Sequence, residues 1–236
     1  MNNILAVLKK ELKSYFNSPI AYIIITVFLS IAGYFFAAGL FIVNEASARN
    51  VMGVIPLIFI FFIPAITMRL ISEEKKIGTI ELMLTMPLKD SEIILGKFLA
   101  SIVLLFIALV FTMVYIITIS LLGDPDGGPI WGGYVGLLLM GSAYLSIGIY
   151  ASSITENQIV SFIIAFVIIF IFFMLDKVLV FAPVSIAPIL EYLSIDFHFN
   201  NITRGVIDSR DVIYYLSITI FALSMASHSL SGRKWS

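Results

Sequence analysis

Long runs without a charged side chain dominate this sequence and limit what the chain can fold into. The run from Ile20 to Val43, for example, contains no Asp, Glu, Lys or Arg. A helix of about 20 apolar residues crosses the hydrocarbon core of a bilayer, whereas barrel strands alternate between apolar and polar residues. The sequence therefore predicts an all-α membrane protein with one transmembrane domain over residues 1–236. Its six expected spans lie at about 20–43, 51–71, 98–122, 130–154, 159–175 and 212–230.

Composition excludes the other broad classes. Hydrophobic residues make up 60% of the chain and charged residues 12%, against about 45–50% and about 25% in soluble domains. Such a chain cannot cover its apolar surface with polar groups in water, which excludes a soluble or a disordered protein. The net charge of −1 gives no sign of a nucleic-acid partner. The absence of cysteine excludes disulfides and thiol catalysis.

The distribution of Lys and Arg predicts the orientation. Six spans leave both termini on one side of the membrane, and that side holds 10 of the 14 basic residues. Because cytoplasmic loops carry an excess of Lys and Arg, we expect both termini in the cytoplasm. The turn at 155–158 has no basic residue, so its cytoplasmic position follows from the span count alone.

The N-terminal segment, residues 2–17, has the pattern of an interfacial helix. Apolar residues recur every three or four positions, and three interfacial basic residues fall between them: Lys9, Lys10 and Lys13. Lysines on such a helix meet anionic lipid headgroups. Ser18 as a cap and Pro19 at the first helical position then predict a new helix. The segment is either a simple membrane anchor, which the sequence favours, or an elbow helix that also braces a partner.

A second segment, the loop at residues 72–92, predicts a short helix outside the spans. Gly78 can interrupt a helix, and Thr79 can cap the helix that follows. Pro87 would end that second helix, so we expect about two helical turns over Thr79–Met86. Its apolar side chains are too many for a solvated face and too few to span a membrane. This helix either lies on the lipid surface or docks into another protein.

A third segment, residues 176–211, is 36 residues long and is expected on the outer side. Helical spacing of Phe199, Ile202 and Val206 predicts short helices packed over the spans, because loops of this length are seldom featureless. The segment is either a structural cap or a gate that binds an external partner.

Candidate catalytic motifs are missing from the sequence. Gly96-Lys97 lacks the other residues of a phosphate-binding loop, and the two histidines, His198 and His228, lie on opposite predicted sides of the membrane. Ser142 has no histidine near it in the same span, so an intramembrane hydrolase is disfavoured. Glu73-Glu74 is interpreted as part of a solvated loop rather than as a membrane-protease carboxylate pair.

Small residues in the fourth span predict close helix packing rather than catalysis. They are Gly132, Gly133, Gly136, Gly141, Ser142 and Gly148. The six spans carry almost no ionisable residue, and such residues normally mark ion or proton pathways. If the protein moves anything uphill, the energy must therefore come from a partner.

Residues 73–87 and 94–98 resemble the signature of type-2 ABC exporter permeases. They read EEKKIGTIELMLTMP and ILGKF, close to the family pattern E-x-K-x-G-T-x-E-x-L-L-x-x-P followed by L-G-K. Residues 155–160 (TENQIV) and the stretch from His198 to Tyr214 are similar to the gliding-motility-associated permease subgroup, its F subunit. The nitrous-oxide-reductase maturation permeases look like close relatives of that subgroup.

The resemblance implies a function for the loop. In the family, the helix after the second span is a coupling helix that docks into a separate ATPase subunit. It would be Thr79–Met86 here, and the implied coupling residues are Glu73, Glu74, Lys75, Lys76, Gly78, Thr79, Glu81, Leu82, Leu84 and Pro87. ATP would bind the partner ATPase, and this chain would carry no catalytic, cofactor or metal site.

The resemblance also implies partners and a location. A second permease, identical or different, would complete the path, and an auxiliary envelope subunit would be a further partner. The location would be the bacterial inner membrane, and the work would be export or an envelope process such as gliding motility. The alternative is a mechanotransmitting or scaffold subunit that moves no solute.

Overall fold

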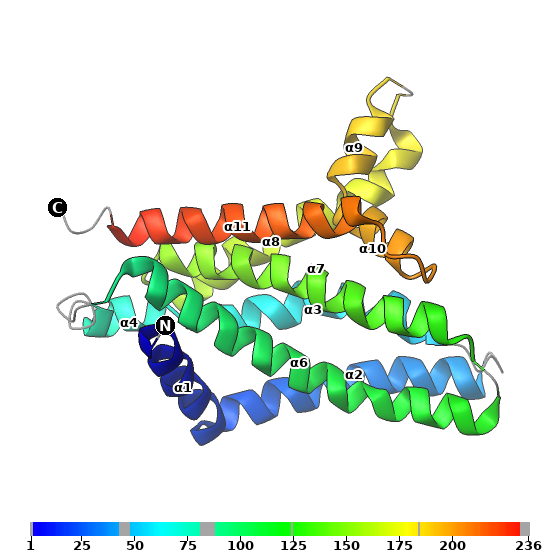
Figure 1. Ribbon diagram of the computed structural model, residues 1–236, viewed down its shortest axis with the longest axis horizontal. Helices are drawn as coiled ribbons and strands as arrows, with labels where there is room; N and C mark the ends of the chain where they lie inside the picture. The colour runs from blue at the N-terminus through cyan, green and yellow to red at the C-terminus, as the bar shows by residue number, and fades with distance from the viewer. Residues whose placement is uncertain (1, 43–47, 81–87, 124, 184, 232–236) are drawn as a thin grey trace.

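The computed structural model describes residues 2–42, 48–80, 88–123, 125–183 and 185–231. In these residues every regular element is a helix (Figure 1). Six helical segments are long and apolar enough to cross a membrane, which confirms the prediction of an all-α protein with six spans. The elements are α1 (Asn2–Asn17), α2 (Pro19–Phe41), α3 (Ala48–Thr67), α4 (Ser72–Ile77), α6 (Asp90–Leu122), α7 (Gly127–Ser153), α8 (Gln158–Val178), the 3-10 helix η1 (Leu179–Phe181), α9 (Ala187–Leu193), α10 (Ile195–Ile202) and α11 (Ser209–Ser231).

Local capping explains where several helices begin. The Ser18 hydroxyl accepts a hydrogen bond from the Ile20 amide at 3.3 Å, and Pro19 takes the first position of α2, as the sequence predicts. The helix of the third span begins at Asp90 rather than near residue 98. The reason is the Glu92 carboxylate, which accepts from the Lys89 amide at 2.9 Å and satisfies a free N–H at the start of α6.

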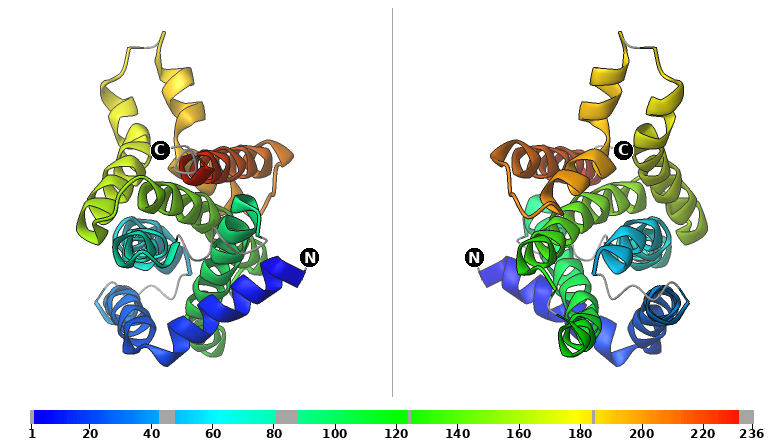
Figure 2. Two further views of the ribbon diagram at one scale, coloured as in Figure 1. Left: turned by 90° about the vertical axis from the view of Figure 1, so that its left-hand side faces the viewer. Right: turned by 90° about the vertical axis from the view of Figure 1, so that its right-hand side faces the viewer.

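Helix α7 lies at the centre of the bundle and contacts α3, α6, α8, α10 and α11 (Figure 2). The glycines of α7 allow neighbouring helices to approach it closely. A methyl group at Gly148 would lie 2.1 Å from the Thr67 hydroxyl of α3, and one at Gly132 would lie 2.4 Å from the Ile202 carbonyl oxygen of α10. The small residues of the fourth span therefore do serve close packing, as the sequence predicts.

The outermost spans show the opposite character. In an apolar stretch of 18 residues from each span, 17% of the stretch is buried within the chain for α2 and 22% for α8, against 72% for α7. Their exposed side chains are almost all apolar, for example Ile23, Val27 and Ile163. Such surfaces suit lipid or another membrane helix rather than water.

The segment between α8 and α11 forms short helices, as expected, but only part of it packs on the spans. Phe199 and Ile202 of α10 are buried against α7, whereas Val206 lies beyond the end of α10 and is 71% exposed. Val206 is therefore not part of a helical apolar face. Helix α9 has no buried residue and projects sideways from the bundle together with the end of α8 (Figures 1 and 2).

The packing of α7 on α10 leads to a prediction for Gly132. We expect Gly132→Ala to lower stability by about 1–3 kcal/mol, because the added methyl group meets backbone that cannot rotate away. Thermal unfolding in mild detergent measures the effect. The control is Gly53→Ala in α3, where nothing lies within 4 Å of the added methyl group. Equal melting temperatures for the two variants would contradict this view of the α7–α10 contact.

Candidate functional site

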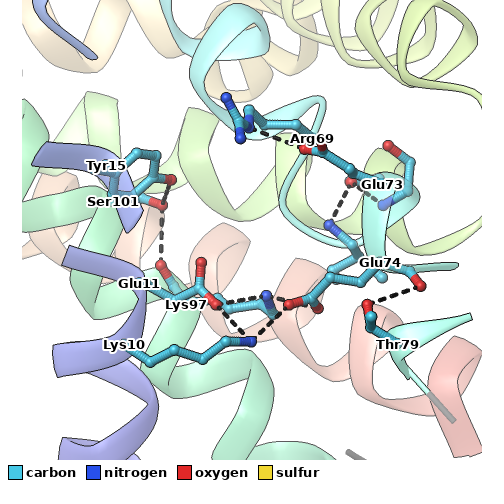
Figure 3. A network of polar contacts seen from close by, with 12 residues as sticks. Lys10, Glu11, Tyr15, Arg69, Glu73, Glu74, Thr79, Lys97 and Ser101 are labelled. Carbon is cyan, nitrogen blue, oxygen red and sulfur yellow. Dashed lines mark hydrogen bonds and ion pairs between the residues drawn. The ribbon is translucent and has the colours of Figure 1, made fainter. Parts of the chain in front are cut away.

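A buried lysine joins three separate segments at the end of the bundle that carries both termini. The Lys97 side chain has no exposed surface. Its Nζ atom lies 2.9 Å from Glu11 Oε1 of α1 and 2.8 Å from Glu74 Oε2 of α4. Lys10 Nζ lies 3.0 Å from the other oxygen of Glu74 (Figure 3). We call Lys10, Glu11, Glu74 and Lys97 the charged cluster.

Electrostatics explains why these four residues occur together. An ammonium group removed from water loses several kcal/mol of solvation, which only close opposite charges can offset. Two lysines and two glutamates make the charged cluster neutral overall. Burial alone would lower the pKa of Lys10, but attraction and hydrogen bonding to Glu74, and then to Glu11, outweigh it and raise the pKa. Lys10 therefore carries its charge.

The residue before Lys97 lets α1 approach α6. A methyl group at Gly96 would lie 2.6 Å from Cβ of Val7, so only glycine permits this crossing. One turn further along, the Tyr15 and Ser101 hydroxyls are 3.3 Å apart, and burial raises the pKa of Tyr15. Gly96 and Lys97, which the sequence identified only through a family pattern, thus hold α1 against the bundle.

Helix α4 is also fixed to α7. The Ser152 hydroxyl of α7 accepts hydrogen bonds from the Ile71 and Ser72 amides, both at 3.0 Å, and so satisfies the N-terminus of α4. The Lys75 ammonium donates to the carbonyl oxygen of Ser153. The Ser229 hydroxyl of α11 donates to this same carbonyl oxygen, at 3.0 Å. Helix α4 is thereby connected to α7, and through the Ser153 carbonyl to α11.

Gly78 ends α4, as the sequence predicts. Its φ of +78° lies in the left-handed region that favours glycine. The Thr79 hydroxyl donates to the Glu74 carbonyl oxygen at 3.3 Å, so it turns back toward α4. Ile80 is 1% exposed. Glu81, Leu82, Leu84 and Pro87, with most of the expected helix Thr79–Met86, lie outside the described residues.

The structure divides the remaining predicted coupling residues into two groups. Glu73 pairs with Arg69 at 3.1 Å, and Glu74 and Lys75 bond to the chain itself as described above. Lys76 is exposed, and so is the neighbouring apolar side chain of Ile77, at 66%. The interpretation of Glu74 as a solvated loop residue is wrong, because 16% of its side chain is exposed and it neutralises a buried lysine. Contact of these residues with an ATPase stays a prediction.

The described residues include no group of three His, Cys, Asp or Glu side chains placed to hold a metal ion. Ser142 of α7 donates to the Leu138 carbonyl oxygen of its own helix at 2.7 Å. The charged cluster itself has two carboxylates tied up by two ammonium groups, so neither is free to abstract a proton. This arrangement suits mechanical connection between helices rather than catalysis.

Comparison with protein families matches residues 5–230 to the family described as ABC-2 family transporter protein. The chain belongs to the ABC-2 transporter family. It is therefore a multi-pass membrane permease subunit of an ABC transporter, and such subunits work with a separate ABC ATPase. A comparison with curated proteins finds no match. The resemblance based on the loop sequence is thus confirmed for the family, and the gliding-motility subgroup stays a prediction.

The charged cluster leads to a prediction for Lys97. Lys97→Met leaves two carboxylates with one exposed lysine, so we expect a loss of about 3–5 kcal/mol of local stability and release of α1. The chain has no cysteine, so Val7→Cys, buried against Gly96, reports release through faster maleimide labelling.

Two comparisons make this test specific. Lys13→Met, at an exposed position of α1, should leave the labelling of Val7→Cys unchanged. Combining Lys97→Met with Glu11→Gln and Glu74→Gln removes the two carboxylate charges that have lost their buried lysine. This triple variant should restore slow labelling. Equal labelling in the Lys97→Met and Lys13→Met backgrounds would show that the ion pairs do not hold α1.

Proposed function

We propose that the ABC ATPase docks on the end of α4 and the segment that follows it, and that the charged cluster passes its movement to the bundle. The carrying observation is the position of Glu74, which lies in α4 and binds the buried Lys97 of α6. Lys76 and Ile77 face outward next to Gly78. The ATPase would bind ATP, and this chain would supply the docking site.

Force applied at α4 would reach most of the helices through contacts described above. The charged cluster leads to α1 and α6, and Lys75 with Ser152 leads to α7. Because the glycines of α7 bring it close to α3, α6 and α10, a displacement of α7 would move these helices with it. Pro56 and Pro64 lie inside α3, where the missing amide donors would permit bending.

A second permease would complete the transport path, in keeping with the resemblance stated above. We place the complex in the bacterial inner membrane with both termini in the cytoplasm. The exposed lysines of α1, Lys9 and Lys13, support this orientation, because they can meet anionic lipid beside the charged cluster.

The work of the complex would be export or an envelope process, with the gliding-motility subgroup as the specific hypothesis. A mechanotransmitting role without solute is the second candidate. It is favoured by the projecting α9, whose exposed Ile189 and Tyr192 could contact an auxiliary envelope subunit. Stimulation of ATP hydrolysis by a defined lipid or solute in vesicles would favour export, and hydrolysis indifferent to every candidate would favour the mechanical role.

If the ATPase docks here, Ile77→Asp should reduce the amount of ATPase that co-purifies with this chain. An acidic side chain at this apolar contact should lower the ATPase activity that co-purifies with the tagged chain by about tenfold or more. ATP hydrolysis per mole of purified chain is the measurement, after extraction from the native host in mild detergent.

Ile189→Asp is the matched control, since Ile77 and Ile189 are similarly exposed, at 66% and 61%, on different segments. It should leave the recovered ATPase activity unchanged. Full recovery with Ile77→Asp, in a chain that elutes as a single species, would contradict docking at this segment.

The proposed orientation predicts the labelling of two single cysteines. Gly123→Cys at the end of α6 should react with a membrane-impermeant maleimide on intact spheroplasts, and Thr155→Cys between α7 and α8 should react only after permeabilisation. The reverse pattern would place both termini outside.

A further inference from the structure

The segment between α8 and α11 contains a buried histidine whose two ring nitrogens both face acceptors. His198 of α10 is 1% exposed. Its Nδ1 atom lies 2.6 Å from Asp211 Oδ1 of α11, and its Nε2 atom lies 2.9 Å from the Tyr192 carbonyl oxygen of α9. His198 thus connects three helices.

Proton counting limits the state of this pair. A carbonyl oxygen only accepts, so Nε2 must carry a proton. A charged carboxylate also only accepts, so Nδ1 must carry one as well. A histidine with both protons is an imidazolium. The single alternative that keeps both hydrogen bonds is a neutral imidazole whose Nδ1 accepts a hydrogen bond from a protonated, uncharged Asp211.

Three features of the surroundings favour the charged pair. Asp211 lies in the first turn of α11, where the positive end of the helix dipole stabilises a carboxylate. Tyr192 lies in the last turn of α9, whose free carbonyl oxygens attract a cation. The imidazole ring stacks on Tyr214 with centroids 3.9 Å apart, which suits a cation over an aromatic face.

Neighbouring bonds show what this pair holds in place. The Tyr214 and Tyr215 hydroxyls of α11 donate to the carbonyl oxygens of Leu193 and Ile195, at 2.5 and 2.8 Å. These two hydrogen bonds and the His198–Asp211 pair all join the start of α11 to the junction of α9 and α10. The second oxygen of Asp211, Oδ2, is buried without a hydrogen-bond partner among the described residues. The carboxylate therefore depends on the contact of its Oδ1 with His198.

We propose that His198 is held as an imidazolium, and that its pair with Asp211 is a proton-sensitive clasp that fixes α9 and α10 to α11. Loss of the His198 proton leaves a buried carboxylate without its counter-charge and removes one ring donor. Protonation of Asp211 at acidic pH also abolishes the ion pair. The clasp is therefore tightest between these two titrations, and it loosens on either side.

The other titratable groups around His198 come from every helix packed against it. Tyr214 and Tyr215 belong to α11 and Tyr192 to α9, and Tyr144 of α7 lies near Tyr215. Asp196 of α10 is bound to Lys177 of α8 at 2.7 Å. Asp196 is thus paired with Lys177, which also binds Asp176 at 2.9 Å, and has a cation other than the imidazolium. His198 and Asp211 lie in α10 and α11, away from the proposed ATPase docking segment at α4.

The first test measures the protonation of the histidine ring directly. The full chain has two histidines, so ring-¹⁵N-labelled protein in lipid nanodiscs gives two sets of signals, assigned with His228→Gln. We expect imidazolium ¹⁵N shifts for His198 at neutral pH, and the signals of His228, which is exposed on α11, disappear in His228→Gln. A neutral ring at His198, in either tautomer, would overturn the proposal.

The second test measures whether the charge holds the helices. We expect Asp211→Asn to speed amide hydrogen exchange in residues 187–203 by about tenfold or more, because one charge-assisted hydrogen bond is lost. His228→Gln is the control and should change nothing there. In the unmodified chain, protection corrected for intrinsic exchange should fall at both acidic and alkaline pH. Unchanged protection in Asp211→Asn would overturn the clasp even if the ring is charged.

Discussion

One buried ammonium group determines how the end of the bundle near both termini is built. Lys97 can lose its water only where carboxylates replace it, and the two that do so come from α1 and α4. Its position on α6 therefore fixes the direction of the N-terminal helix and the start of the long loop. Gly96 serves the same contact, since any larger residue would push α1 away from the carboxylate that Lys97 needs.

The centre of the bundle depends on a different principle, which is close backbone contact. Helix α7 meets the short Thr67 side chain of α3 at Gly148 and the backbone of α10 at Gly132. Steric packing of this kind resists displacement of one helix relative to another, because the close-packed interior has few voids into which atoms could move. Charge at one end and close packing in the middle together make the bundle a suitable transmitter for movements generated outside this chain.

The sequence predicts the elements better than it predicts their contacts. Uncharged runs reveal the six spans because a bilayer requires apolar length, and Ser18-Pro19 and Gly78 reveal local breaks because their chemistry is local. Glu11 and Lys97 are separated by 86 positions, and no periodicity links them. The lysines of α1 look like lipid-facing charges for the same reason, although Lys10 turns toward Glu74.

The outer segment illustrates a similar limit. Helical spacing finds Phe199 and Ile202, but it extends wrongly to Val206, which follows the end of α10. The sequence gives no sign that His198 and Asp211 form a pair, because no spacing pattern links a lone histidine to a carboxylate 13 positions away. Only the fold brings them together, by turning α11 back beside α10.

The charged cluster also has a consequence for biosynthesis. Helix α1 leaves the ribosome long before Lys97, since α2, α3 and α4 must be made first. Until α6 is inserted, Glu11 has no buried cation to meet, and α1 must wait at the membrane surface with its carboxylate still hydrated. The N-terminal helix can therefore reach its final place only after α6 has been inserted.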